Sequence, residues 1–270
     1  MPGLAEALLD LQELTRRLRR DCPWDREQTA RTIVPHTVEE AYEVADAARA
    51  GDPEKLRDEL GDLLFQVYFL SLLLEEQDAG DLDDVARAVH DKLVRRHPHV
   101  FGDAEARTAG RVRERWEAIK TEQEGRSGIF HDVPGSLPAL LLARKVQRRA
   151  AAVGYDWPSL EGPAAKVREE VDEVLDELER AGRPAPETEP DAAVEAELGD
   201  LLFTVVNLAR FVNVDPELAL RGAAARFRQR VERAEELAAD AGEDWAALDL
   251  AGQERWYERA KAALGSAERR

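Results

Sequence analysis

The sequence contains one nine-residue segment twice. Residues 59–67 read ELGDLLFQV and residues 197–205 read ELGDLLFTV, so eight of nine positions agree. A tryptophan precedes each copy (Trp24 and Trp157), and between the tryptophan and the repeated segment lies a triplet with the spacing Glu-Glu-x-x-Glu. The triplets are Glu39, Glu40 and Glu43 in the first copy and Glu169, Glu170 and Glu173 in the second. Recurrence of several features in the same order predicts two copies of one module.

The junction between the copies is marked by residues that break helices. Residues 125–138 (GRSGIFHDVPGSLP) contain three Gly and two Pro, which suits a linker. We therefore expect an N-terminal domain over residues 1–130 and a C-terminal domain over residues 131–270. A second Pro-rich loop, residues 182–190, lengthens the hairpin of the second copy.

Helical periodicity dominates the chain. Val171, Val174, Leu175 and Leu178 recur at i, i+3, i+4 and i+7, and alternating strand-like runs are absent from the sequence. The sequence therefore predicts an all-α fold. Residues 63–74 and 201–214 are apolar nearly all round, which predicts burial on most sides, as in the centre of a bundle.

The charge balance excludes several classes of protein. The chain has 56 acidic and 38 basic residues, a net charge of −18. This charge is repelled by phosphate backbones and by anionic lipid, so we expect neither nucleic-acid nor membrane binding. With one cysteine, no apolar run of about twenty residues and no secretory signal, the sequence indicates a soluble cytoplasmic protein.

The acidic residues are concentrated in a pattern that suggests chemistry. On a helix, residues i and i+3 lie on one face, so Glu170 and Glu173 stand together, as do Glu197 and Asp200 on the next helix. If these two helices pack antiparallel, the four carboxylates meet. The equivalent residues of the first copy are Glu40, Glu43, Glu59 and Asp62.

Four converging carboxylates repel one another unless protons or a cation intervene. Oxygen-only ligation without His or Cys favours Mg²⁺, with Mn²⁺ as the alternative, over zinc. The competing interpretation is that these glutamates form ordinary surface ion pairs. Two triplets, each followed by the same ELGD beside an apolar helix, favour the metal site.

At this point the chain resembles a known family. CPWDREQT at residues 22–29, the two Glu-Glu-x-x-Glu triplets and the two ELGD segments resemble MazG, the tandem-domain nucleoside triphosphate pyrophosphohydrolases. The resemblance extends from about residue 9 to residue 261. It implies an all-α, Mg²⁺-dependent enzyme that cleaves nucleoside triphosphates to monophosphate and pyrophosphate. It also implies a homodimer in which helices of two subunits complete each bundle.

Carried onto this chain, the resemblance assigns residue roles. The metal ligands would be Glu170, Glu173, Glu197 and Asp200, with Glu170 also counted as catalytic. A carboxylate left off the metal, Glu169, would orient or deprotonate the water that attacks the α-phosphorus.

Cations are needed opposite an acidic metal site that holds a triphosphate. Lys166 reaches the same helix face as Glu169, while Arg226 and Arg230 share a face of a later helix. Trp256 matches the family's aromatic near the base or ribose, although core packing explains it equally well. The corresponding basic residues of the first copy are Lys55, Lys92 and Arg96.

Neither copy matches the family pattern fully. The lysine four residues before the ELGD glutamate is Lys55 in the first copy but Ala193 in the second. The first copy has His36 where the second has Lys166. The terminal Trp-x-x-x-Lys is intact as Trp116 and Lys120, whereas the second copy has Trp256 and Ala260, with Lys261 one step late. We place activity in the second copy and keep the first as a candidate.

A second class of function stays open at this stage. The chain could be a non-catalytic helical module that binds nucleotide or a protein partner and uses its metal for structure. Retention of the full carboxylate set in both copies favours the enzyme, because a binding module could discard Glu39 or Glu169 at little cost.

Overall fold

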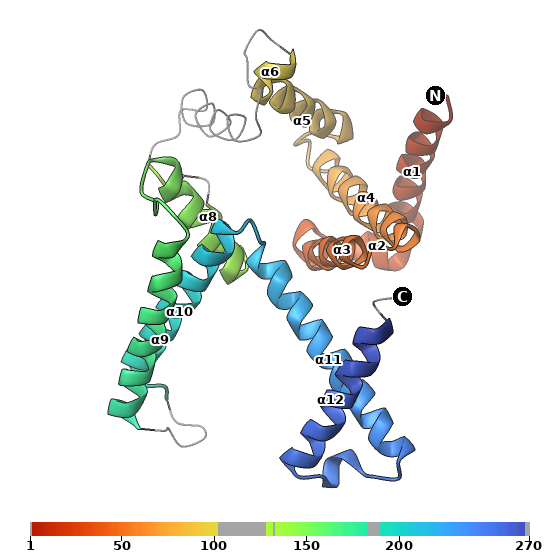
Figure 1. The fold of residues 1–270 in the computed structure, drawn as a ribbon. Coiled ribbons are helices and arrows are strands. Elements are labelled where there is room, and N and C mark those ends of the chain that lie inside the picture. Colours follow the sequence, from red (N-terminus) through yellow and green to blue (C-terminus); the bar gives the residue numbers. More distant parts are fainter. Residues whose placement is uncertain (1, 102–127, 132, 183–188, 268–270) are drawn as a thin grey trace. The chain divides into compact units, whose positions relative to one another are not determined.

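The computed structural model describes residues 2–101, 128–131, 133–182 and 189–267 (Figure 1). Within these ranges the regular elements are helices and no strand occurs, which confirms the all-α prediction. The chain divides into two compact units, Met1–Gly125 and Arg126–Arg270. The boundary near residue 130 stays a prediction.

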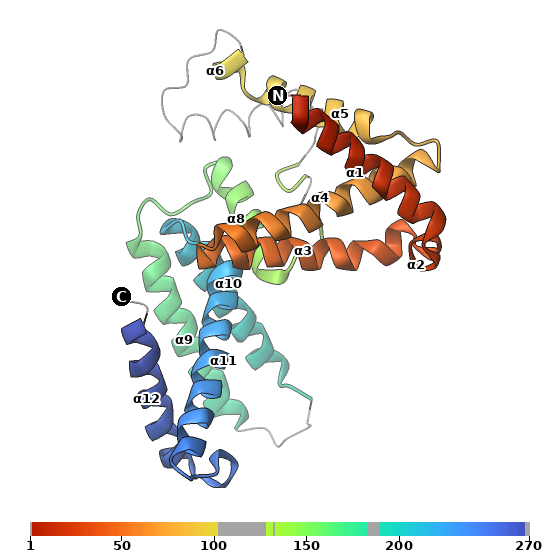
Figure 2. The ribbon, with the colours of Figure 1, turned by 90° about the vertical axis from the view of Figure 1, so that its right-hand side faces the viewer.

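The first unit is built on a helical hairpin. Helices α3 and α4 lie side by side, α1 packs across α4, and α5 follows α4 through a short turn (Figure 2). The helices are α1 (Pro2–Asp21), α2 (Pro23–Glu27), α3 (Ala30–Ala50), α4 (Pro53–Glu75), α5 (Leu82–Arg96) and α6 (Pro98–Phe101).

The second unit contains two hairpins. Helices α9 and α10 pack along each other, α8 contacts α10, and α11 pairs with α12 (Figure 1). The elements are α8 (Ala139–Ala152), α9 (Glu161–Ala181), α10 (Ala192–Phe211), α11 (Pro216–Asp240), the 3₁₀ turn η1 (Trp245–Ala247) and α12 (Leu250–Ala267).

Local sequence sets the ends of the helices that carry the acidic residues. Thr29 and Thr32 form a capping box at the start of α3, and Gly51 ends that helix at φ +70°, a left-handed conformation that favours glycine. Asp52 then caps α4, with Pro53 at its first position. This short turn between α3 and α4 brings the first Glu triplet beside ELGD.

The buried apolar clusters are small in both units. Ile33, Phe69 and Leu73 form the cluster of the first unit. In the second unit, Ala234, Ala238, Trp256 and Ala260 pack between α11 and α12. The α9–α10 pair instead buries isolated residues such as Val174 and Val206.

The prediction of burial on most sides holds for most of segment 63–74, whose exposed members are Leu64, Val67 and Leu74, but it is wrong for segment 201–214, which is more open in this single chain. Phe69 and Val206 are fully buried, but Leu202 is 57 % exposed. Other exposed apolar residues of α4 and α10 are Leu60, Leu64, Val67, Leu74, Leu198, Phe203 and Val205. Periodicity identified these faces as apolar but could not show what covers them.

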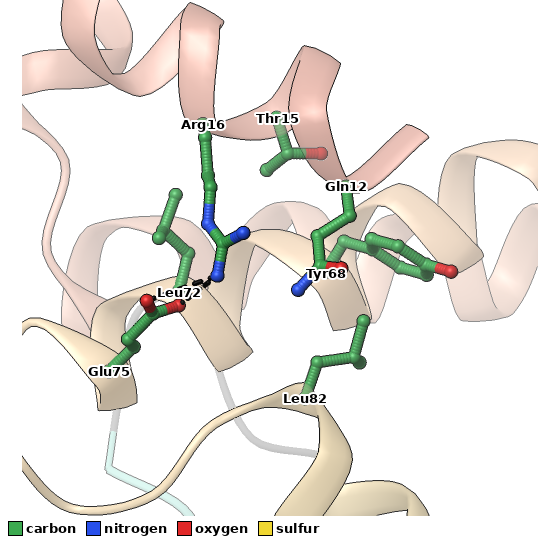
Figure 3. Close-up of a pocket in the computed structure, with 7 residues that line it drawn as sticks. All are labelled: Gln12, Thr15, Arg16, Tyr68, Leu72, Glu75 and Leu82. Carbon is green, nitrogen blue, oxygen red and sulfur yellow. Dashed lines mark hydrogen bonds and ion pairs between the residues drawn. The ribbon is translucent and has the colours of Figure 1, made fainter. Parts of the chain in front are cut away.

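A hollow in the first unit lies away from Glu40, Glu43 and Glu59. Gln12 and Thr15 of α1 face Tyr68 and Leu72 of α4, and the ion pair between Arg16 and Glu75 closes one side (Figure 3). Tyr68 is nine residues from Glu59, or about 14 Å along the axis of α4. This hollow therefore belongs to the packing of α1 on α4.

None of the described helices is both long enough and apolar enough to span a bilayer.

Candidate functional site

The α9–α10 hairpin brings three carboxylates to one point. Glu170 of α9 and Glu197 and Asp200 of α10 each offer an oxygen within 4.8 Å of the others. Glu170 is 4 % exposed, whereas Asp200 is exposed. The cluster thus has one buried member and an open side, as a site that admits a substrate requires.

The two oxygens of Glu170 have different surroundings. Its Oε1 lies 2.9 Å from the Lys166 ammonium. Its Oε2 is buried and accepts no hydrogen bond within the described structure. A buried, unpartnered carboxylate oxygen is costly, because it has lost its hydration without compensation. This oxygen points to a ligand that the protein alone does not supply.

Lys166 is the cation of the second cluster. Its Nζ lies 2.7 Å from Glu169 Oε1 and 3.7 Å from Glu173 Oε2, in addition to its contact with Glu170. Hydrogen bonds to Glu169 and then to Glu170 raise the pKa of Lys166 above its ordinary value. The side chain therefore stays charged, and it holds the whole Glu triplet.

Glu173 shows the repulsion that remains. Its pKa is raised by desolvation and by the charges of Glu170, Glu169 and Glu197, although Lys166 works in the opposite direction. One ammonium thus compensates only part of the negative charge at this site. Glu169 is the exposed member of the triplet.

The first copy assembles a similar cluster in the α3–α4 hairpin. Glu40, Glu43 and Glu59 offer oxygens within 4.8 Å of one another. The buried member is Glu59 of α4, which is 8 % exposed. Asp62 is exposed and lies outside this trio, but its charge contributes to the raised pKa of Glu40.

Repulsion also governs the first cluster. Desolvation, followed by the charges of Asp62 and Glu43, raises the pKa of Glu40. Desolvation and hydrogen bonding with Glu43 raise the pKa of Glu59, while Lys55 lowers it from 3.8 Å away. His36, at the position of Lys166, lies 3.7 Å from Glu39.

The basic residues proposed to grip phosphate lie on other helices. Arg226 and Arg230 lie on α11, and no ion pair or hydrogen bond in the described ranges joins either to the carboxylates of α9 and α10. Lys92 and Arg96 lie on α5. Trp116 and Lys120 fall outside the described residues.

Trp256 is a core residue of the α11–α12 hairpin. It is 5 % exposed, and its indole N–H donates to Glu243 Oε2 at 2.9 Å. The Arg259 guanidinium stacks 4.5 Å from its ring centroid. In the single chain this tryptophan has no open face for a base.

Sequence reasoning missed a contact between the segment before α9 and the end of α10. Arg210 of α10 binds the Asp156 carboxylate through two nitrogens. The Asp156 Oδ1 also accepts the backbone N–H of Trp157 at 2.9 Å. The signal available was the YDWP segment, in which Asp156 directly precedes the tryptophan of the second copy.

The donor set fits a hard divalent cation. Each cluster supplies carboxylate oxygens only, which Mg²⁺ and Mn²⁺ accept, and the unpartnered Glu170 Oε2 is free to ligate. Exposed members such as Asp200 leave space for water or phosphate oxygens beside the ion.

Comparison with known proteins agrees with this arrangement. The family model of the MazG nucleotide pyrophosphohydrolase domain matches twice, over residues 28–101 and 159–235. The chain belongs to the MazG family. Both matched segments contain a complete Glu triplet and the ELGD segment that follows it.

Two of the curated relatives described here match along nearly the whole chain, and a third matches about half of it. A nucleoside triphosphate pyrophosphohydrolase of Escherichia coli K12 is 43 % identical over 95 % of this chain and 96 % of its own length. A nucleoside triphosphate pyrophosphohydrolase/pyrophosphatase MazG of Thermotoga maritima is 38 % identical over 96 % of each chain. A nucleoside triphosphate pyrophosphohydrolase of Mycobacterium tuberculosis is 38 % identical over 55 % of this chain and 46 % of its own. The chain is thus a hydrolase of the MazG family.

Proposed function

We propose that this chain hydrolyses nucleoside triphosphates to the monophosphate and pyrophosphate, by attack of water on the α-phosphorus in the presence of Mg²⁺. Mn²⁺ is the alternative ion. The observation that carries the proposal is the second carboxylate cluster, in which a buried oxygen of Glu170 has no partner. The names of the E. coli and T. maritima relatives support the same reaction.

The metal ligands in this proposal come from both helices of each hairpin. Glu170 and Glu173 of α9 and Glu197 and Asp200 of α10 hold the ion in the second copy. Their counterparts in the first copy are Glu40, Glu43, Glu59 and Asp62. A bound Mg²⁺ supplies positive charge that neutralises phosphate oxygens as the bond to the leaving pyrophosphate breaks.

The remaining roles fall to side chains that stay off the ion. Glu169 is exposed and adjacent to Glu170, so its carboxylate is placed to orient the attacking water and accept its proton. Lys166 exchanges its carboxylate partners for a phosphate oxygen when substrate binds. Arg226 and Arg230 complete the phosphate grip, while Trp256 packs in the core between α11 and α12.

The exposed apolar faces support assembly as a homodimer. Leu202 and Phe203 of α10 and Leu175 of α9 are between 43 % and 57 % exposed, which leaves apolar surface in water. We propose that a second copy of the chain covers these faces and brings its basic residues to the carboxylates. Light scattering of the purified chain tests this: a dimer is expected, and Leu202→Glu should convert it to monomer.

Two domains, residues 1–130 and 131–270, would then each carry one hairpin with its cluster. We place turnover in the second, because Lys166 there contacts three members of the triplet.

Pyrophosphate release from a panel of nucleoside triphosphates and deoxynucleoside triphosphates tests the proposal. Wild type, Glu170→Gln and Glu40→Gln are compared with Mg²⁺. Loss confined to Glu170→Gln supports the enzyme and its second-copy site. Loss confined to Glu40→Gln moves the site to the first copy. No release by wild type, with Mg²⁺ still bound, supports the binding module instead.

A single variant tests the role of the general base. Glu169→Gln is expected to lower kcat by about 10² to 10⁴, the usual contribution of general base catalysis, with Mg²⁺ affinity unchanged. Turnover near that of wild type would exclude Glu169 from this role.

A further inference from the structure

We propose that Arg144 is a positioning residue of the second copy, which acts through Asp215 to set the direction in which α11 leaves α10. This inference rests on the proposed function and adds to it the contact that orients the arginines of α11 toward phosphate. Arg144 lies on α8, the helix that contacts both α10 and α11 (Figure 1).

Asp215 connects Arg144 to the first turn of α11. Its Oδ1 accepts the Leu218 backbone N–H at 3.1 Å and so caps the helix, while its Oδ2 accepts a hydrogen bond from the Arg144 guanidinium. The side chains of Arg144 and Asp215 are only 23 % and 25 % exposed. A single carboxylate thus joins α8 to the start of α11.

Gln147 fixes the same helix to α10. It follows Arg144 by three residues, so both side chains lie on one face of α8. Its Nε2 donates to the backbone carbonyl of Phe203 at 2.7 Å, and the residue is 6 % exposed. Phe203 comes one turn after Asp200, a proposed metal ligand. Helix α8 therefore contacts the metal-binding helix through one side chain and the start of α11 through the other.

Stability alone does not explain these two polar side chains. Arg144 Nε and Gln147 Oε1 are buried and have no hydrogen-bond partner in the described structure. An apolar residue would avoid this penalty, and a partly buried ion pair adds little to stability because desolvation offsets the attraction. What the charged hydrogen bond supplies is a fixed geometry between the groups that it joins.

The direction of α11 matters because the arginines proposed to bind phosphate lie far along it. The connection from α10 is four residues long and includes Asn213 at φ +58°. Arg226 and Arg230 follow Asp215 by about 17 and 22 Å along the axis. A change of about 5° in the direction of α11 would displace them by about 1.5 to 2 Å, enough to break a hydrogen bond. This holds whether they bind phosphate in their own chain or in a second copy.

The first copy lacks the contact. In α1, Gln12 and Thr15 stand in the order that Arg144 and Gln147 have in α8, three residues apart and followed by two arginines. They line the hollow beside the start of α5 (Figure 3). In this described part of the chain, no hydrogen bond joins Gln12 to Asp81, which caps α5. Gln12 is therefore a matched control for Arg144.

The test separates positioning from stability. For wild type, Arg144→Gln, Arg144→Lys and Gln12→Leu, kcat and KM for ATP are measured, and calorimetry gives the affinities for Mg²⁺ and for inorganic tripolyphosphate with Mg²⁺. Arg144→Gln is expected to raise KM and to weaken tripolyphosphate binding about tenfold, as loss of one charged hydrogen bond implies, with kcat and Mg²⁺ affinity within about twofold of wild type. Arg144→Lys keeps the charge opposite Asp215 and should stay within about threefold, and Gln12→Leu should resemble wild type.

A second variant tests the same contact from its other side. Asp215→Asn keeps an oxygen that can cap α11 but removes the negative charge, so it should raise KM as Arg144→Gln does. The double variant should add nothing further, because both substitutions remove one interaction. A lower kcat at unchanged KM in Arg144→Gln would mean a merely structural role, and an equal rise of KM in Gln12→Leu would show that the effect is not specific. Either result would overturn the inference.

Failure of the proposed function is recognised separately. If wild type binds tripolyphosphate with Mg²⁺ but releases no pyrophosphate, hydrolysis is excluded, and the affinity of Arg144→Gln for tripolyphosphate still decides whether this residue orients the phosphate-binding side chains. An active wild type, with unchanged KM in both Arg144→Gln and Asp215→Asn, would overturn the inference and leave the proposed function standing.

Discussion

The two copies place their lysine on opposite helices of the hairpin. In the first copy the buried carboxylate is Glu59 of α4, with Lys55 four residues before it. In the second copy it is Glu170 of α9, with Lys166 four residues before it. Each buried glutamate thus has a lysine one turn toward the N-terminus.

The two lysines compensate their clusters unequally. Lys166 lies 2.9 Å from Glu170 and also contacts its neighbours, whereas Lys55 is 3.8 Å from Glu59. In the first copy the pKa values of both Glu40 and Glu59 are raised, with desolvation as the largest cause. The comparison teaches that one carboxylate pattern can carry different amounts of uncompensated charge. Under the proposed function, the first cluster would hold a cation alone, and the second would hold a cation together with phosphate.

Replacing the equivalent carboxylates Glu197 and Glu59 should produce the largest difference in activity between the two copies. Glu197→Gln is expected to lower kcat/KM by at least about 100-fold, because loss of a ligand weakens metal binding at least as much as loss of an outer-shell partner. Glu59→Gln should leave kcat/KM within about threefold and instead reduce the stabilisation of the chain by Mg²⁺. Kinetics and thermal unfolding with and without Mg²⁺ check both results.

The matched control is Asp58→Asn, an exposed acidic residue next to Glu59. This substitution should leave both kcat/KM and the stabilisation of the chain by Mg²⁺ unchanged. Equal activity losses in Glu59→Gln and Glu197→Gln would mean that both copies turn over substrate, and the division of tasks would be wrong.

Sequence alone predicted the helices and the meeting of carboxylates from both helices of each hairpin. Of the four carboxylates predicted to meet in each copy, three do so, and Asp62 and Glu173 lie outside these groups. Glu170 and Glu173 are related by helix geometry, and the repeat showed that ELGD belongs beside them. The sequence could not show that Glu170 rather than Glu173 is buried, since this depends on how α9 packs against α10. Nor could it show that Trp256 is enclosed while Trp157 is open, because both are tryptophans near helix-forming segments.

Replacing Lys166, the basic residue of the second cluster, should have opposite effects on Mg²⁺ binding and on nucleotide binding. Lys166→Gln eliminates an ammonium in contact with Glu170, so Mg²⁺ binding without nucleotide should tighten about tenfold. Because the same ammonium is proposed to contact phosphate, KM for the nucleoside triphosphate should rise about tenfold. Calorimetric titration with Mg²⁺ and steady-state kinetics measure the two effects.

Lys55→Gln is the control from the first copy. Its longer contact with Glu59 predicts a smaller gain in Mg²⁺ affinity, with KM near that of wild type. If Lys166→Gln weakened Mg²⁺ binding, the lysine would be organising the ligands and would not be competing with the ion.

An ion pair in each unit should make stability depend on pH in the same direction. Hydrogen bonds from Arg19 and from Arg210 lower the pKa values of Glu76 and Asp156. A carboxyl with a lowered pKa stabilises the folded state above its unfolded pKa, and this stability is lost as the pH falls through the folded value. After allowance for solvent screening, Glu76→Gln or Asp156→Asn should cost about 1 kcal/mol in the free energy of unfolding at pH 7.

Urea unfolding at pH 7 and below pH 4 checks this prediction. The cost of each substitution should shrink as the pH falls toward the lowered pKa of the folded wild-type carboxyl. A cost that stays the same at both pH values would contradict the contribution of these two ion pairs to the pH dependence of stability.

The smallest expected contrast concerns how the two Glu-bearing helices begin. Helix α3 starts with the Thr29–Thr32 capping box, whereas α9 starts after Leu160, whose side chain caps nothing. Thr29→Ala should destabilise the start of α3 by about 1 kcal/mol, because an amide of the first turn loses its acceptor. Leu160→Ser should change α9 by only a few tenths, since its backbone is helical (φ −64°, ψ −26°) and capping side chains require an extended residue. Hydrogen exchange of first-turn amides measures each helix separately, and a large gain in α9 would show that the packing of Trp157 on Gly162 does not fix that end of the helix.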